Sequence, residues 1–366
     1  MKINGEQRSS IWYDNEKDCV TILDQTKLPF SIEYFDLLSV DDFITAIKTM
    51  QVRGAPLIGV TGAYGLAFAI KSNSEINHIN NIAKQIENAR PTAVNLQWAV
   101  NKVIDTVKEH EEKDRFQASL TTAEKIRSDD INNCSAIGDF GVEIIKEIYD
   151  SFETRRPVNI LTHCNAGWLA AIDWGTALSP IYKAQQAGIP IHIWVDETRP
   201  RNQGASLTAF ELKQQDIPHT IIPDNTGGHL MQHGMVDLCI VGSDRTTSNG
   251  DVCNKIGTYL KALAAHDNNI PFYVALPCST FDWTLTNGVN QIPIEQRDTS
   301  EVSHITGIDA EGIISTVKVI PDGCKAANYG FDVTPAKYIT GLITEFGVYN
   351  ANSRSLATLK TKLNLL

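Results

Sequence analysis

The sequence lacks long apolar segments and dense runs of positive charge. No run of about 18 apolar residues occurs, so we expect no membrane-spanning helix. The 32 lysines and arginines are outnumbered by 43 aspartates and glutamates, which gives a formal net charge of −11. Nucleic-acid backbones bind positive surfaces, so this balance argues against a nucleic-acid partner. The first residues contain no apolar core of a secretory signal, which indicates a cytoplasmic protein.

A disulfide framework and the common cofactor motifs are also missing. The seven cysteines are odd in number and form no C-x-x-C pair, so we expect reduced thiols. No G-x-G-x-x-G, G-x-x-x-x-G-K-[ST] or H-E-x-x-H segment occurs, which argues against standard dinucleotide, Walker-type and zinc-protease sites. His163 has no second metal ligand at a suitable spacing, and we interpret it as a helper or structural histidine. We therefore expect neither a metal nor an organic cofactor.

Strands and helices alternate regularly after residue 157. Five apolar strands are predicted, at 158–161, 189–195, 219–222, 238–241 and 272–276. Helices are expected between them, and Asn254-Lys255 is expected to open one of these helices. This alternation predicts an α/β fold with a Rossmann-like, doubly wound parallel sheet.

The preceding part of the chain predicts a smaller domain of a β-hairpin and helices. The hairpin strands are expected at 19–29 and 30–35, and Ser39 to Asp42 matches a capping box that begins a helix. Further helices are predicted at 57–70, 93–109, 123–127 and 137–149. We expect an N-terminal domain over 1–130 and a catalytic domain over 131–366.

Polar residues follow four of the predicted strands. They are Cys164, Asp196, Asp224 and Asp244. Right-handed crossovers place the carboxyl ends of parallel strands at one edge, where ligands of such sheets bind. Cys164 could act as an acid, a base or a nucleophile, or be a small buried apolar residue. Asp244 could be an acid or could cap the following helix, and the spacing alone leaves both alternatives open.

Two arginines stand close to helix-starting prolines. Pro56 suits the first turn of a helix, and the free amides there, next to Arg53 and Gly54, would bind an anion. Arg90 precedes Pro91, which is expected to open the helix at 93–109. The two arginines could hold one phosphate. The alternative is a pair of unrelated helix junctions, with Gly54 as a helix C-cap and Arg53 as a surface charge.

Six segments together resemble the methylthioribose-1-phosphate isomerases, the aldose–ketose isomerases of methionine salvage. They read RGAPLIGVTGAYGLA, RPTAVNL, LTHCNAG, DETRPRNQGASLTAFEL, VGSDRTTSNGDVCNKIGTY and FDVTPAKYITGLITEFGV. The resemblance covers about residues 12–348, with the segments in the same order. The wider group includes ribose-1,5-bisphosphate isomerases and regulatory subunits of a eukaryotic translation-initiation exchange factor.

The resemblance implies a role for nine residues. Asp244 would be the proton donor and Cys164 its proton-transfer partner, through an enolate-like intermediate, with a hydride shift as the alternative. The implied substrate-binding residues are Arg53, Gly54, Ala55, Arg90, Gln203, Asn254 and Lys255. The resemblance further implies a small sugar 1-phosphate as substrate, no cofactor and a homodimer.

The position of the sugar's 5-substituent is less well defined by the motifs. Trp168 and Trp174 follow Cys164 closely and are candidates for an apolar pocket around a methylthio group. The segment 224–229 is richer in glycine than the usual form of the family, and we expect it to reshape this pocket.

Two alternatives compete with this interpretation. One is an isomerase of 5-deoxyribose 1-phosphate or ribose 1,5-bisphosphate, although a bisphosphate would need a second cationic site. The other is a non-catalytic regulatory subunit of the same fold. The resemblance implies that such subunits lack the full set of Cys164, Asp244, Asn254 and Lys255, which is complete here.

Overall fold

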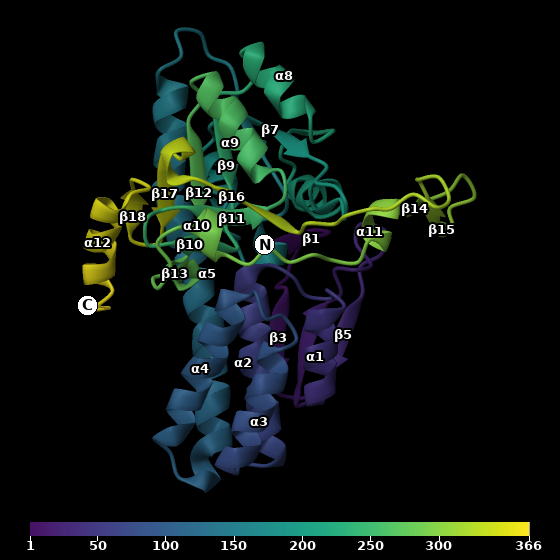
Figure 1. Cartoon of the computed structure of the whole chain (residues 1–366), viewed down its shortest axis with the longest axis vertical. Coiled ribbons are helices and arrows are strands. Elements are labelled where there is room, and N and C mark those ends of the chain that lie inside the picture. Colours follow the sequence, from purple (N-terminus) through teal and green to yellow (C-terminus); the bar gives the residue numbers. More distant parts are fainter. Residues whose placement is uncertain (366) are drawn as a thin grey trace.

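The computed structural model describes residues 1–365, which form a helical part below a sheet-containing part (Figure 1). The helical part consists mainly of α1 (Val40–Lys48), α2 (Ala55–Ser72), α3 (Ile76–Glu87) and α4 (Val94–Lys108). Every residue from 57 to 70 in α2 is buried, because this helix is surrounded by its neighbours. Glycines permit the close packing: a Cβ atom on Gly62 would lie 2.3 Å from Leu96 Cδ1 of α4.

An antiparallel sheet covers one side of these helices, with the strand order β3 (Ile11–Asp14), β4 (Cys19–Leu23), β5 (Tyr34–Leu37). Pairing of β4 with β5 confirms the predicted hairpin, but the predicted strands were too long and β3 was missed. The chain turns earlier than expected because the Asp24 carboxylate accepts a hydrogen bond from the Thr26 amide at 2.9 Å. A short pair, β1 (Lys2–Ile3) and β2 (Glu6–Gln7), precedes this sheet.

The predicted capping box begins α1. The Asp42 amide donates to Ser39 Oγ, and the Ser39 amide donates to Asp42 Oδ2 at 2.8 Å. Two backbone donors at the helix start are thereby satisfied.

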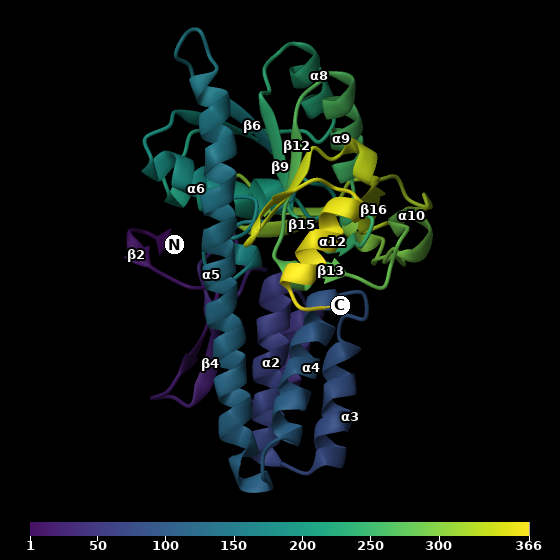
Figure 2. The same ribbon diagram turned by 90° about the vertical axis from the view of Figure 1, so that its left-hand side faces the viewer.

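Helix α5 (Arg115–Asp150) is a single helix of 36 residues that runs along both parts of the molecule (Figure 2). The prediction of two helices at 123–127 and 137–149 was therefore wrong. The polar stretch between them has weak helix propensity, but packing against α2, α4 and α6 (Ser179–Gln186) outweighs it. The expected domain boundary at residue 130 falls inside this helix, and the division into two domains stays a prediction.

A seven-stranded sheet forms the other part, in the order β18-β17-β12-β9-β6-β7-β8. Its five predicted strands are present as β6 (Val158–Thr162), β7 (Ile191–Asp196), β8 (His219–Ile222), β9 (Leu238–Val241) and β12 (Phe272–Ala275). Each is parallel to its neighbours, which confirms the α/β fold. The sequence analysis missed β17 (Gly341–Thr344) and the antiparallel edge strand β18 (Gly347–Tyr349).

Helices cover both faces of this sheet. Ile160 packs on the side of α5, α6 and α7 (Ala209–Gln214), whereas Leu161 packs on the side of α8 (Thr226–Gln232) and α9 (Thr258–Asp267). Burial on both faces explains why the central strands β9 and β12 are continuous apolar runs, whereas the edge strand β8 leaves Thr220 and Ile221 exposed. Among residues 1–365, no helix is long and apolar enough to cross a membrane.

The order of the strands reverses between β6 and β9. From β6 the chain proceeds outward through β7 and β8, then returns to β9 on the other side of β6 and continues through β12 and β17. Such a switch point leaves a crevice at the carboxyl ends of the two central strands.

A second sheet lies near the middle of the molecule, between the seven-stranded sheet and the helical part (Figure 1). Its strands, in spatial order, are β13 (Phe281–Asp282), β10 (Arg245–Thr247), β11 (Val252–Lys255) and β16 (Phe331–Thr334). Asn254 and Lys255 lie on β11, so the prediction that they open a helix was wrong. They pair with β16, and α9 begins only at Thr258, after Gly257 turns the chain at a φ of 103°.

The remaining elements lie around the second sheet and at the end of the chain. They are α10 (Gly288–Gln291), α11 (Ser300–Ser303), the hairpin of β14 (His304–Ile308) and β15 (Ile314–Lys318), and α12 (Ser353–Lys362). Figure 1 shows the hairpin projecting from the side of the molecule.

Candidate active site

One pocket at the carboxyl ends of β6 and β9 contains all nine residues to which the resemblance assigns a role. The pocket lies between the start of α2 and the two sheets. The nine residues are Arg53, Gly54, Ala55, Arg90, Cys164, Gln203, Asp244, Asn254 and Lys255. Tertiary structure therefore joins segments that are far apart in the sequence.

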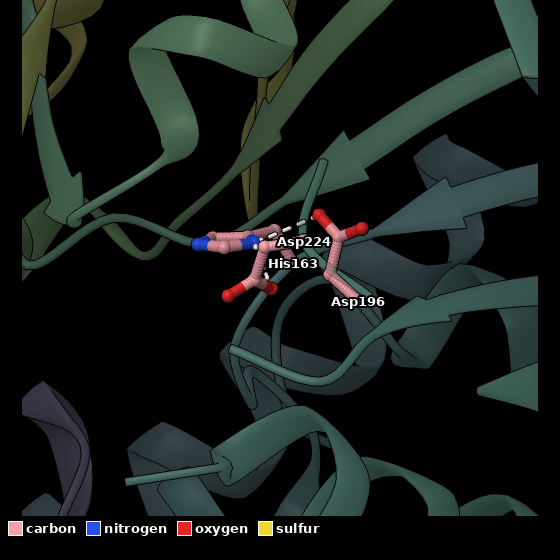
Figure 3. A group of neighbouring side chains, drawn as sticks. All are labelled: His163, Asp196 and Asp224. Carbon is pink, nitrogen blue, oxygen red and sulfur yellow. Dashed lines mark hydrogen bonds and ion pairs between the residues drawn. The ribbon is translucent and has the colours of Figure 1, made fainter. Parts of the chain in front are cut away.

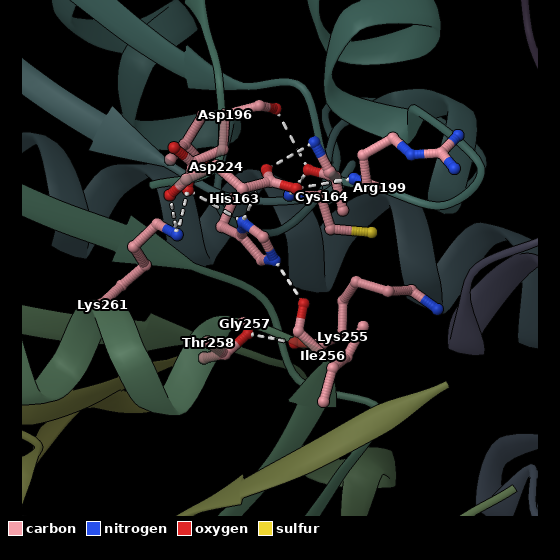
Figure 4. Close-up of polar contacts among 12 residues, drawn as sticks. His163, Cys164, Asp196, Arg199, Asp224, Lys255, Ile256, Gly257, Thr258 and Lys261 are labelled. Atoms are coloured by element: carbon pink, nitrogen blue, oxygen red, sulfur yellow. Dashed lines mark hydrogen bonds and ion pairs between the residues drawn. The ribbon is translucent and has the colours of Figure 1, made fainter. Parts of the chain in front are cut away.

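Cys164 is held in a fixed backbone conformation directly after β6. Its φ of 66° is uncommon for a residue other than glycine. Its amide donates to Thr198 Oγ1 at 2.8 Å, and its carbonyl oxygen accepts from Thr208 Oγ1 at 2.7 Å. Figure 4 shows the thiol extending toward the same side as the Lys255 side chain.

Asp244 follows β9 and shares the pocket with three cations. Burial raises the pKa of its carboxyl group, whereas the positive charges of Lys255, Arg90 and Arg53 oppose the rise. Burial also lowers the pKa of Lys255, and the negative charges of Cys164 and Asp244 oppose that change. The pocket thus combines an acid of raised pKa with groups that bind an anion.

Arg53 is positioned by Asn165, the residue after Cys164. Nη1 of the arginine donates to Asn165 Oδ1 at 2.6 Å, and Nη2 donates to the Asn165 carbonyl oxygen at 2.8 Å. Only 8% of Arg53 is exposed, so the interpretation of this residue as a surface charge is excluded. Pro56 lies in the first turn of α2, as predicted, whereas Gly54 is the N-cap of this helix and not a C-cap.

Glu211 completes this network, and the sequence analysis did not assign it a role. Its carboxylate is fully buried and accepts four hydrogen bonds, from Asn165 Nδ2 at 2.7 Å, Trp168 N at 2.9 Å, Leu169 N at 3.1 Å and Tyr182 Oη at 2.7 Å. Gly167 is required beside it, because a Cβ atom there would lie 1.9 Å from Glu211 Oε2. The available signal was a glutamate between two apolar residues, Phe210 and Leu212, in this short helix.

Arg90 is contacted by a second residue that the sequence did not reveal. Its Nη2 lies 3.4 Å from Glu295 Oε2, and Glu295 also pairs with Arg297 at 2.8 Å. Pro91 does not open the next helix, as was expected, because residues 91–92 form a turn and α4 starts after Ala93. This turn places Arg90 at the pocket.

Asp196 and Asp224 lie at the predicted sheet edge but behind the pocket, where they surround His163 (Figure 3). The three side chains offer ligand atoms within 4.8 Å of one another, as a metal site would. However, Lys261 Nζ lies 3.2 Å from Asp196 Oδ2 and supplies a positive charge. Asp224 accepts from the amides of Thr198 and Arg199, both at 2.7 Å. Asp196 Oδ2, His163 Nδ1 and both Asp224 oxygens thus have partners within the protein, so we assign the group no metal.

Two suggestions about the 5-substituent pocket were wrong. Trp168 is fully buried in the core beneath the sheet, and neither it nor Trp174 lines the pocket. The glycine-rich segment 224–229 starts α8 instead, where Gly227 packs against Leu161. Apolar lining of the pocket comes from other side chains, which include Met50, Ile58, Ala170, Ala171, Ile292, Pro293 and Phe331.

The fold and this pocket define an α/β protein with a binding site for a small anionic molecule at the switch point of its sheet. A sequence model of the initiation factor 2 subunit family matches residues 51–351. A protein from Methylorubrum populi named methylthioribose-1-phosphate isomerase is 56% identical over 359 residues, 98% of each chain.

Solved structures agree with the sequence comparison. The 5-methylthioribose 1-phosphate isomerase from Pyrococcus horikoshii OT3 matches with a TM-score of 0.83 at 35% identity, over 98% of this chain and 97% of the other. The delta subunit of translation initiation factor eIF-2B from A. fulgidus matches with a TM-score of 0.78, also at 35% identity, over 96% and 100% of the two chains. The chain belongs to the initiation factor 2 subunit family and, within it, to the methylthioribose-1-phosphate isomerases.

Proposed function

We propose that this protein converts 5-methylthioribose 1-phosphate to 5-methylthioribulose 1-phosphate in methionine salvage. Relatives with more than half of their residues identical carry the name of this isomerase. The observation that supports the assignment most directly is the pocket itself, in which an acid of raised pKa, a thiol and three cations meet.

The substrate's chemistry requires such a combination. The phosphate sits on the anomeric carbon, so the ring must open while the phosphate stays attached. Asp244 donates its proton to the ring oxygen as the bond from C1 to that oxygen breaks. Cys164, as the thiolate, takes the proton from C2 and becomes a thiol, which leaves an enol between C1 and C2. The proton then returns to C1, and the C2 hydroxyl returns one to Asp244, which yields the ketose.

Asp244 must be protonated to begin this sequence, and the raised pKa favours that state. Positioned acids and bases each typically contribute about 10²–10⁴-fold to a rate.

The phosphate is bound by Arg53, Arg90 and Lys255, with the amides at the start of α2 around Gly54 and Ala55. These groups enter the pocket from both parts of the molecule. The bound dianion neutralises charge that would otherwise keep Asp244 ionised.

Gln203 and Asn254 contact the sugar hydroxyls in this proposal. Within the described residues, Gln203 Oε1 is buried without a hydrogen-bond partner, which suits an acceptor for a substrate hydroxyl. The methylthio group lies against the apolar lining, in which Met50, Ile58, Ile292 and Phe331 are the largest side chains. A methyl group also fits such a surface, so 5-deoxyribose 1-phosphate is a second substrate to test.

The protein functions as a cytoplasmic homodimer in this proposal. Six of its seven free cysteines are buried and only Cys324 is exposed, which suits a reducing compartment. Light scattering coupled to size-exclusion chromatography tests the dimer, and a monomeric mass would refute it.

An NMR time course in deuterated water tests the reaction. Purified protein is mixed with each sugar phosphate separately, and the 1-phosphoketose is followed by phosphorus and proton signals. Product formation that is lost in Cys164→Ala and Asp244→Asn, but kept in Cys239→Ala, supports the assignment. Cys239 is the matched control, because it is a fully buried thiol on β9 away from the pocket.

The deuterium content at C1 of the product distinguishes proton transfer from a hydride shift. Deuterium at C1 indicates proton transfer with solvent exchange, whereas complete retention of hydrogen favours a hydride shift. If folded protein converts neither sugar, the proposed function is wrong.

A further inference from the structure

His163, which directly precedes Cys164, lies between two hydrogen-bond acceptors. Its Nδ1 is 2.8 Å from Asp196 Oδ2 and its Nε2 is 2.8 Å from the carbonyl oxygen of Ile256 (Figure 4). A neutral imidazole has one N–H and one acceptor nitrogen, so one of these contacts would bring two acceptors together. The ammonium group of Lys261, 3.2 Å from Asp196 Oδ2, favours Asp196 as a carboxylate, which can only accept. With that carboxylate, both contacts are hydrogen bonds only if both ring nitrogens carry hydrogen.

The charges around the ring agree with this state. Three carboxylates face it: Asp196 from the end of β7, Asp224 at 3.9 Å from the loop before α8, and Asp332 from β16. The only cation among them is Lys261 of α9, which pairs with Asp196. Within the described residues, Asp196 Oδ1 has no hydrogen-bond partner, so the excess negative charge is not neutralised there. A positive His163 reduces the imbalance in a site that is almost inaccessible to water.

The ring also joins two strand ends that carry residues of the pocket, Cys164 and Lys255. On one side, Cys164 follows it in the chain. On the other side, it holds the carbonyl of Ile256, which follows Lys255. The backbone lies directly against the ring at Gly257, where a Cβ atom would lie 3.0 Å from His163 Nε2. A shift of the ring would therefore change the position of Cys164 relative to Lys255.

We propose that His163 is a doubly protonated positioning residue, which fixes the end of β6 at Cys164 relative to the end of β11 at Lys255. The effect on catalysis rests on the proposed isomerase function. The protonation state of His163 does not depend on the isomerase function, so the inference and the proposed function can fail separately.

Nitrogen-15 NMR of protein labelled in its nine histidine rings tests the protonation state. At about pH 8 an ordinary histidine, with a pKa near 6.5, is neutral. We expect one ring whose two nitrogens both remain protonated, and its signals disappear in His163→Gln. If every ring in the wild-type spectrum is neutral at that pH, the inference is wrong, and this result does not depend on any variant folding.

Asp196→Asn provides a second measurement. An amide can donate to Nδ1, so the ring no longer needs its second hydrogen, and we expect it to become neutral at about pH 8. A merely structural histidine would not respond in this way. Unchanged double protonation in Asp196→Asn would contradict the assigned partner.

Kinetics test the positioning role. His163→Gln can donate to only one of the two acceptors, so we expect kcat per folded molecule to fall by about 10²-fold, as for a displacement of about 1 Å in an active site. KM changes much less, because Arg53 and Arg90 still bind the phosphate. His192→Gln is the matched control: this histidine lies on β7, contacts Thr220, and should leave kcat unchanged. Wild-type kcat in folded His163→Gln would overturn the positioning role.

Discussion

The buried carboxylate of Glu211 provides a quantitative test of how Arg53 is positioned. Each of its oxygens receives two donors: Oε1 from Asn165 and the Leu169 amide, Oε2 from the Trp168 amide and Tyr182. Glu211→Gln replaces one oxygen with an amino group that faces two donors. In either orientation of the amide, one buried backbone N–H loses its acceptor.

The magnitude follows from that lost acceptor. An unsatisfied buried N–H destabilises a protein by about 1–3 kcal/mol. Burial raises the pKa of Glu211, so removal of the charge recovers part of this loss. We expect the free energy of unfolding to fall by about 2 kcal/mol. Because Asn165 then holds Arg53 less firmly, KM should rise about tenfold, which corresponds to about 1.4 kcal/mol.

Urea denaturation and steady-state kinetics measure the two effects. Tyr182→Phe is the matched control, since it removes one donor but leaves every backbone N–H with its acceptor. Its KM should equal that of the wild type. The reasoning is refuted if Glu211→Gln has both the stability and the KM of the wild-type protein.

Further variants and a pH profile test other parts of the site, and a last variant tests a buried carboxyl group of α5. Gly54→Ala should lower kcat/KM by about 10²-fold, because the residue has a φ of 92° and its Cβ would lie 2.2 Å from the Ala170 carbonyl oxygen. Gly188→Ala is the control: this residue has a φ of 72° but nothing within 4 Å of the added Cβ, so kcat/KM should not fall. Equal kinetics of the two variants would contradict the steric argument. Asp244→Asn should lower kcat by about 10²–10⁴-fold with little change in KM, and a retained kcat would exclude Asp244 as the acid. In the wild type, activity should fall as pH rises through the raised pKa of Asp244. The bound phosphate offsets the cations that lower this pKa, so the fall in kcat should occur at higher pH than the fall in kcat/KM. pH profiles in the opposite order would count against Asp244 as the acid. Burial raises the pKa of Asp130 to about 7, so folding takes up a proton between about pH 4 and 7 and stability falls as pH rises through that range. Asp130→Asn should therefore increase the free energy of unfolding at about pH 8 by up to roughly 4 kcal/mol but not at about pH 4, as urea titrations at both pH values would show.

Predictions from local pattern were reliable for the buried strands. The central strands β9 and β12 are apolar because both faces of the sheet are covered there, and that burial is visible in composition alone. The same reasoning failed for α5, whose polar centre is helical only because α2, α4 and α6 pack against it. It failed again at Asn254 and Lys255, which pair with a strand about 75 residues further along the chain.

The sequence by itself determined the doubly wound sheet, the polar residues at its carboxyl ends and, through the resemblance, the nine residues that line one pocket. Those features depend on short-range patterns and on motifs that can be read directly. Only the tertiary structure decided which groups hold them in place: Glu211 through Asn165, Glu295 beside Arg90, and His163 between Asp196 and Ile256. A buried polar group takes its partner from whichever segment the fold brings within about 3 Å, and no local pattern encodes that distance.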